Sequence, residues 1–107
     1  MYSENENIEF KDLGDGVRRK VLSYTEDMMI CELHFEKGAI GAPHSHPHEQ
    51  IGYLVSGSLI YKEDGKEDKV LVAGDVYQVP SNVVHGVVAL EETKLIDVFT
   101  PMRKDFI

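Results

Sequence analysis

Pro43-His44-Ser45-His46-Pro47-His48-Glu49-Gln50 is the stretch on which the organisation of this sequence depends. Three of the five histidines of the chain fall within five positions here, and His85 follows downstream in an apolar run. Clustered histidines in a short chain are typical of a metal site, because neutral imidazole is the commonest side-chain ligand for metals. We therefore expect the fold to bring His85 to the first cluster.

Length and charge limit the class of protein. The chain has 107 residues and a formal net charge of −8, which predicts one domain over residues 1–107 and argues against nucleic acid as a partner. No apolar run approaches the ~18 residues needed to cross a membrane. The acidic start lacks the basic and apolar regions of a signal peptide. Together with a single cysteine, Cys31, this predicts a cytoplasmic protein.

Short apolar runs between glycine, proline and aspartate predict an all-β chain without long helices. Strands are expected over residues 17–24, 28–36, 50–55, 58–63, 69–73, 76–79, 85–90 and 94–99. Residues 1–7 are expected to fray, and residues 37–43 to form a loop because they contain two glycines and a proline. The tail, residues 100–107, can fold over the mouth of a barrel. The composition predicts a sandwich or small barrel.

Strand geometry brings candidate ligands together. Residues two apart in a strand point to the same face, about 6.6 Å apart at ~3.3 Å rise per residue, so His44 and His46 can reach one ion. Gln50 can add a carbonyl oxygen, and His85 must arrive from a distant strand. Three nitrogens and one oxygen leave one or two open positions, which is typical of a catalytic metal. The alternative is a histidine-rich surface loop.

The glycines and prolines around these histidines resemble the two cupin motifs. In the first, Gly38 is followed after five residues by His44-Ser45-His46, after three more by Gln50, and after six more by Gly57. In the second, Gly74 is followed after five residues by Pro80 and after four more by His85. The resemblance implies a double-stranded β-helix, the cupin jelly-roll barrel, with one divalent metal held inside by His44, His46, Gln50 and His85.

The chain departs from the usual cupin pattern at three positions. Gln50 stands where a cupin usually has glutamate, and Asn82 and Ala89 stand where glycine and asparagine are usual. Replacing glutamate by glutamine leaves a dication with its full charge, which makes it a stronger electrophile. The change also weakens the hold on hard, oxygen-loving ions. Nickel, zinc, iron and manganese all suit this nitrogen-rich ligand set.

One group of cupins has the same departure. The run from His44 to Tyr53 looks like the pectin-degradation cupins of the KdgF type, in which glutamine is the expected fourth ligand. The end of the chain, from Asp97 to Phe106, is similar to the end of those proteins. The resemblance implies ring opening of 4,5-unsaturated monouronates, released from pectin or alginate, to a linear 4-deoxy-5-keto uronate.

Several residues can carry that chemistry. Asp97 shares a strand face with Leu95 and Phe99 and can act as acid and base near a metal; the alternative is a solvent-facing aspartate. Arg103 has the planar fork that pairs with a carboxylate, or it is a solvated tail residue. Phe99 is expected to contact the substrate, with packing in the core as the equal alternative. Gln78 is expected to line the pocket, and His48 to hydrogen-bond to the metal ligands. Glu49 is the motif acid only if the alignment slips by one residue.

Two other classes of function remain open. One is a different metal-dependent cupin enzyme, of the dioxygenase or the sugar isomerase or epimerase type. The other is a cupin that binds a sugar acid without turning it over. Ring opening needs neither oxygen nor redox change, so oxygen consumption separates it from dioxygenase chemistry.

If Gln50 faces inward, then Ile51, Tyr53 and Val55 form an outward apolar row, which predicts a homodimer.

Overall fold

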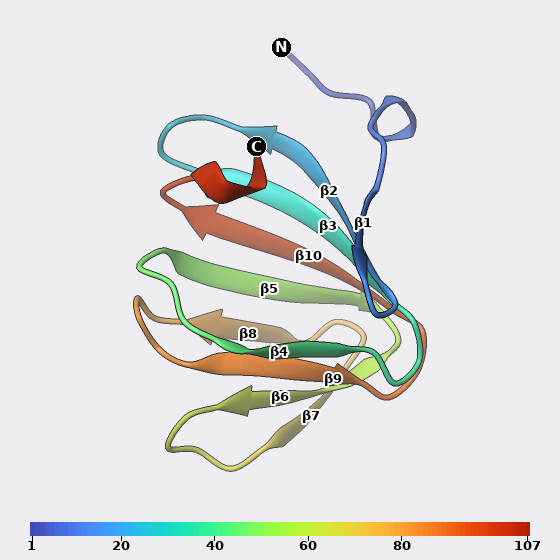
Figure 1. Cartoon of the computed structure of the whole chain (residues 1–107), viewed down its shortest axis with the longest axis vertical. Coiled ribbons are helices and arrows are strands. Elements are labelled where there is room, and N and C mark those ends of the chain that lie inside the picture. The colour runs from blue at the N-terminus through green and yellow to red at the C-terminus, as the bar shows by residue number, and fades with distance from the viewer.

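The computed structural model describes all 107 residues as ten strands in two sheets that face each other (Figure 1). The large sheet has the order β1 (Lys11–Gly14), β2 (Val17–Tyr24), β3 (Met29–Phe35), β10 (Thr93–Thr100), β5 (Glu49–Ser56) and β8 (Val76–Val79). The small sheet has the order β4 (Ile40–His44), β9 (His85–Ala89), β6 (Ser58–Glu63) and β7 (Lys69–Val72). All pairings are antiparallel. The predicted all-β jelly-roll architecture is confirmed, and no helix is long and apolar enough to cross a membrane.

The core lies between the inner faces of the two sheets. Alternate residues of β5 and β10 are buried, as the period of a strand requires. The main apolar cluster consists of Val17, Phe35, Ala39, Leu54, Leu59, Tyr77, Val79, Val87, Ala89 and Leu95. A second, smaller cluster of Met29, Cys31 and Phe99 packs against Met102 and Phe106 of the C-terminal tail. The inward direction predicted for Asp97 and Gln50 is confirmed, because both are 5% exposed.

Strand β4 corrects the prediction of a loop over residues 37–43. It lies at the edge of the small sheet and pairs only with β9, so Pro43, which has no N–H to donate, is tolerated there. The backbones of β4 and β9 approach closely, because a Cβ on Gly86 would lie only 2.7 Å from the carbonyl oxygen of Gly41. The pairing places His44 directly opposite His85.

The last part of the N-terminal segment, which is expected to fray over residues 1–7, is held against the large sheet. Residues Asn5–Asn7 form a short 3-10 turn. The side chain of Asn5 donates to Oε1 of Glu32 at 2.9 Å, and Nζ of Lys20 donates to the Asn5 side-chain oxygen at 2.8 Å. These contacts attach the segment to the outer side of β2 and β3.

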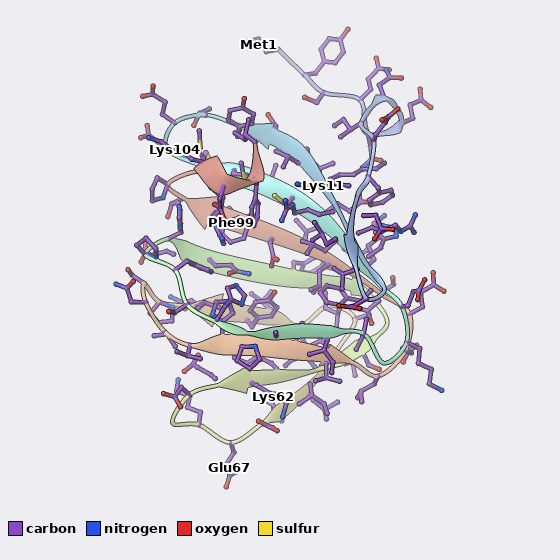
Figure 2. All side chains as sticks on the ribbon, viewed as in Figure 1. Met1, Lys11, Lys62, Glu67, Phe99 and Lys104 are labelled. Atoms are coloured by element: carbon purple, nitrogen blue, oxygen red, sulfur yellow. The ribbon has the colours of Figure 1, made fainter.

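The C-terminal tail crosses one end of the large sheet. Its last residues form a second 3-10 turn, Lys104–Phe106, which lies near the ends of β10, β3 and β2 in Figure 1. The ring of Phe106 meets Phe99 edge-on, with 5.6 Å between the ring centroids. Figure 2 shows Phe99 close to the turn that carries Lys104. The tail therefore covers the smaller apolar cluster.

Candidate metal centre and active site

Three histidine rings meet between the two sheets. His44 ends β4, His85 begins β9, and His46 lies in the connection from β4 to β5. The ring centroid of His85 is 4.6 Å from that of His44 and 5.0 Å from that of His46. One ring nitrogen from each histidine lies within 4.8 Å of the other two. The structure thus brings together the three histidines that the spacing predicted as ligands.

The backbone around each ring selects the tautomer that a metal needs. Each Nδ1 lies 2.9–3.0 Å from a backbone carbonyl oxygen: His44 from Ala42, His46 from His48, and His85 from Val83. A carbonyl only accepts, so each Nδ1 carries the proton and each Nε2 presents a lone pair. Nε2 of His85 is fully buried and has no hydrogen-bond partner. Burial lowers the pKa of His46 and of His85, which keeps these rings in the neutral, ligating form.

The amide of Gln50 adds an oxygen to the three nitrogens. Its Oε1 lies 2.9 Å from Nε2 of His46, so two acceptors face each other with no proton between them. A cation in contact with both atoms removes this repulsion. The amide also acts on the carboxyl of Asp97, whose pKa it lowers. An orphaned imidazole nitrogen and an acceptor pair are what a site for a divalent transition metal leaves behind, so these residues fit such an ion.

Two neighbours of Gln50 lie outside the cluster. The ring of His48 is not among the converging groups, and its backbone carbonyl holds Nδ1 of His46. The hydrogen bonding predicted for His48 is therefore made by its backbone. Glu49 is exposed, so it cannot supply the motif acid.

Asp97 is a buried carboxyl next to this cluster. Its Oδ1 accepts a 2.8 Å hydrogen bond from the hydroxyl of Tyr77. Burial raises the pKa of Asp97 above its ordinary value, although hydrogen bonds from Tyr77 and Gln50 act in the opposite direction. Tyr77 fits because residue 52 is glycine, where a Cβ would lie 2.1 Å from Cζ of the tyrosine. The sequence alone does not predict this contact between Tyr77 and the carboxyl.

A cavity of about 320 Å³ opens beside these groups. Its polar and aromatic lining includes Arg19, His44, Gln50, Tyr77, His85, Asp97, Phe99, Arg103 and Phe106. Arg103 is 8% exposed, and its Nε and Nη2 donate to the two carboxylate oxygens of Asp105 at 3.0 and 2.8 Å. The structure therefore brings Asp97, Phe99 and Arg103 into one cavity with His44 and His85.

Two other residues differ from the sequence-based expectation. Gln78 is exposed on the outer face of β8 and does not line the cavity, because the pairing of β8 with β5 turns Tyr77 inward instead. Its predicted contact with substrate is wrong. Arg19 lines the cavity and is 9% exposed. It was not predicted, because the sequence does not distinguish it from its charged neighbours in the run Arg18-Arg19-Lys20. The inward positions of Val17 and Val21 were the only available signal.

Comparisons with known proteins agree with this geometry. Residues 31–99 match the family model described as Cupin domain. The chain is 44% identical over 108 residues to the Pectin degradation protein KdgF of Dickeya dadantii (strain 3937), covering 99% of this chain and 97% of the relative.

Two solved structures superpose closely. An RmlC-like cupin from Shewanella frigidimarina NCIMB 400 has a TM-score of 0.95 and 40% identity, over 99% of this chain and 95% of that one. KdgF from Halomonas sp. has a TM-score of 0.95 and 37% identity, over the full length of both chains. The chain therefore belongs to the cupin family, together with the KdgF proteins.

Proposed function

We propose that the protein is a metal-dependent enzyme that opens the ring of 4,5-unsaturated monouronates from pectin or alginate, giving a linear 4-deoxy-5-keto uronate. The observation that carries the proposal is a buried carboxyl, Asp97, in the same cavity as two of the three converging imidazoles and two arginines. The 44% identity to a pectin degradation protein supports the substrate class.

His44, His46, Gln50 and His85 would hold one divalent transition metal ion, for which nickel, zinc, iron and manganese are all suitable. When bound, the ion supplies Lewis-acid stabilisation of negative charge that develops on a substrate oxygen. The neutral amide of Gln50 leaves the positive charge of the ion undiminished. The remaining open positions suit one or two oxygens of a sugar.

Ring opening is an isomerisation in which protons are moved and no electrons are lost. The bond between C1 and the ring oxygen breaks, the C1 hydroxyl loses its proton to become an aldehyde, and C4 gains a proton as C5 becomes a ketone. We assign delivery of the C4 proton to Asp97, because burial raises its pKa and favours the protonated acid. The proton lost from the C1 hydroxyl restores the carboxyl.

The other lining residues would orient the sugar. Phe99 offers a flat apolar surface on the cavity wall, 5.8 Å from the ring of His46 between centroids. Arg103 would pair with the uronate carboxylate. Its bidentate contact with Asp105 uses two N–H groups and leaves the other three of the guanidinium for the substrate.

The substitution Asp97→Asn tests the proposal, with Asp68→Asn on the surface as the matched control. We expect nuclear magnetic resonance to detect formation of the linear 5-keto product with the parent and the control, and at least a hundredfold slower formation with Asp97→Asn. Metal content is measured on each protein. Product formation at the parental rate by metal-loaded Asp97→Asn would show that Asp97 is not the proton donor.

We further propose that residues 1–107 act as one domain and associate as a homodimer in the cytoplasm. Ile51, Tyr53 and Val55 project from the outer face of β5 and are 50%, 46% and 38% exposed. An apolar row of this kind favours burial against a second copy. Light scattering at micromolar concentration is expected to give twice the mass of the chain, and a monomer would contradict the proposal.

A further inference from the structure

Arg19 is a buried cation that the proposed reaction has not yet used. It lies on β2 between Val17 and Val21, on the row of side chains that faces the cavity. Its guanidinium carbon is 3.6 Å from the centroid of the Phe106 ring. Arg103 approaches the same ring at 4.3 Å. Two guanidinium groups therefore share one aromatic ring on the cavity wall.

The two arginines differ in how their charges are balanced. Arg103 is paired with Asp105, whereas none of the ion pairs of the molecule includes Arg19. Burial lowers the pKa of Arg19 and the positive charge of Arg103 lowers it further, although Cys31 and the carboxylate of Asp105 act in the opposite direction. An unpaired charge that is 9% exposed costs free energy unless an anion compensates it. The position of Arg19 on the cavity wall indicates that this anion enters from the cavity.

The cavity lining has two chemically distinct groups of residues. His44, Gln50 and His85 form the histidine group, and Arg19, Arg103 and Phe106 form the arginine group. Phe99 is close to both, because its ring is 5.8 Å from that of His46 and 5.6 Å from that of Phe106. One sugar ring against Phe99 can thus place ring oxygens near the histidine group and a carboxylate near the arginine group.

We propose that Arg19 and Arg103 form a two-arginine clamp for the carboxylate of the substrate, in which Arg19 selects sugar acids over neutral sugars. This inference rests on the proposed function for the identity of the natural substrate. Guanidinium–carboxylate hydrogen bonds are charge-assisted and directional. A neutral sugar would leave Arg19 buried and unpaired, so it binds more weakly.

The test compares D-galacturonate with D-galactose, which differ at C6, where one has a carboxylate and the other a hydroxymethyl group. Calorimetry on the zinc-loaded protein measures the binding of each sugar to the parent, Arg19→Met and Arg18→Met. Methionine keeps apolar contact with Phe106 and removes only the charged head. Arg18 is the matched control because it is an exposed arginine over Phe10 on the opposite face of β2.

We expect the parent to bind galacturonate in preference to galactose. Arg19→Met should weaken galacturonate binding roughly tenfold or more and leave galactose binding unchanged. Arg18→Met should match the parent. With unsaturated uronate as substrate, Arg19→Met should raise KM, because the clamp holds the carboxylate of the bound sugar. Undiminished galacturonate binding by folded Arg19→Met would overturn the proposal, as would a parent without preference for the acid.

A measurement on the parent protein alone tests the clamp even if Arg19→Met does not fold. In the zinc-loaded protein, the side-chain Nε–H resonance of Arg19 should shift on addition of galacturonate and remain in place with galactose. An unmoved Arg19 signal at saturating galacturonate would overturn the clamp.

If the parent binds galacturonate through Arg19 but does not open unsaturated uronates, the clamp stands and the ring-opening function is rejected. If it opens them with the same KM in Arg19→Met, the function stands and the clamp is rejected.

Discussion

At the residue scale, the amide of Gln50 lies between two groups with different requirements. Nε2 of His46 is 2.9 Å from its oxygen, and the amide lowers the pKa of the buried Asp97 carboxyl. An amide can serve both groups, because its oxygen can ligate a cation while its NH2 group is able to donate to a carboxyl. A glutamate here would place a second carboxylate beside a buried one, and like charges raise the pKa of one of the pair.

The substitution Gln50→Glu should therefore separate metal binding from activity. We expect the variant to retain or strengthen metal binding and to lose at least tenfold in turnover, because the added charge perturbs the protonation of Asp97 and reduces the net charge of the metal centre. Metal analysis and turnover are measured on the same sample. Gln78→Glu, on the exposed face of the neighbouring strand, is the control. Parental turnover by Gln50→Glu would contradict the need for a neutral ligand.

Single residues differed in how far the sequence predicted them. Asp97 and Phe99 could be placed because they alternate with outward residues on a strand that also carries Leu95. Gln78 could not be placed, because β8 has only four residues, with Tyr77 as the aromatic and Gln78 as the polar candidate for the inward position. Which of the two faces inward is fixed only when the strand pairs. Tyr77 takes the inward position through its partner Gly52, 25 residues away in sequence.

At the element scale, the pairing of β5 with β8 sets the position of the proposed acid. The ring of Tyr77 is stacked on Tyr61 with 4.8 Å between centroids, and its other side occupies the space above Gly52. In the same region, amino-acid composition alone does not predict strand β4. The two glycines and the proline of residues 37–43 indicate a loop, and only pairing with β9 makes residues 40–44 a strand. The partner strand lies more than 40 residues away, so local sequence carries no sign of it.

The substitution Gly52→Ala tests this packing. The added methyl group would lie 2.1 Å from Cζ and 2.6 Å from the hydroxyl oxygen of Tyr77, so the ring must move away from Asp97. We expect the free energy of unfolding to fall by about 1–3 kcal/mol, as in other overpacked cores, and turnover to fall at least tenfold. Chemical denaturation and turnover measure the two effects. Ser56→Ala, at the exposed end of the same strand, should change neither, and parental activity in Gly52→Ala would contradict the account.

The N-terminal segment and strand β3 supply a pH-dependent part of the stability. Burial raises the pKa of Glu32, but hydrogen bonds from Asn5 and His34 and the charge of Lys94 outweigh it and leave the pKa below its ordinary value. The charged form is thus favoured in the folded protein. This stabilisation is fully present above the unfolded pKa of about 4.3 and is lost as pH falls through the lower folded pKa.

Glu32→Gln should accordingly lower the free energy of unfolding by about 1–3 kcal/mol at pH 7, and this difference from the parent should shrink below pH ~4. Denaturant titrations at several pH values provide the comparison. Glu36→Gln, exposed just beyond the end of β3, is the control and should follow the parent throughout. A difference between Glu32→Gln and the parent that persists undiminished at pH 3 would show that the charge of Glu32 is not responsible.

At the scale of the whole molecule, the two sheets join ligands that lie far apart in the chain. His44 and His46 come from one connection, and His85 is brought from the second motif by the pairing of β4 with β9. An ion bound by all of them stabilises the folded state and not the unfolded chain. At a hundredfold excess of zinc over Kd, the thermal midpoint should rise by roughly 10 °C or more.

His85→Ala should abolish most of that rise, because it removes the only ligand from the second motif. The rise in the parent should also diminish below pH ~6, since imidazole must be neutral to bind a metal. Differential scanning fluorimetry with and without zinc measures both effects. An equal rise in His85→Ala would place the ion elsewhere in the protein.

The most direct measurement of the central claim is the rate at which the metal-loaded protein consumes an unsaturated galacturonate monomer. The reaction is followed by loss of the ultraviolet absorbance of the conjugated double bond, with buffer and metal-stripped protein in parallel. We expect rapid loss of absorbance with the metal-loaded protein and slow loss in buffer. The rapid rate should return when metal is added back to the stripped protein. A rate no faster than buffer with fully loaded protein would contradict it.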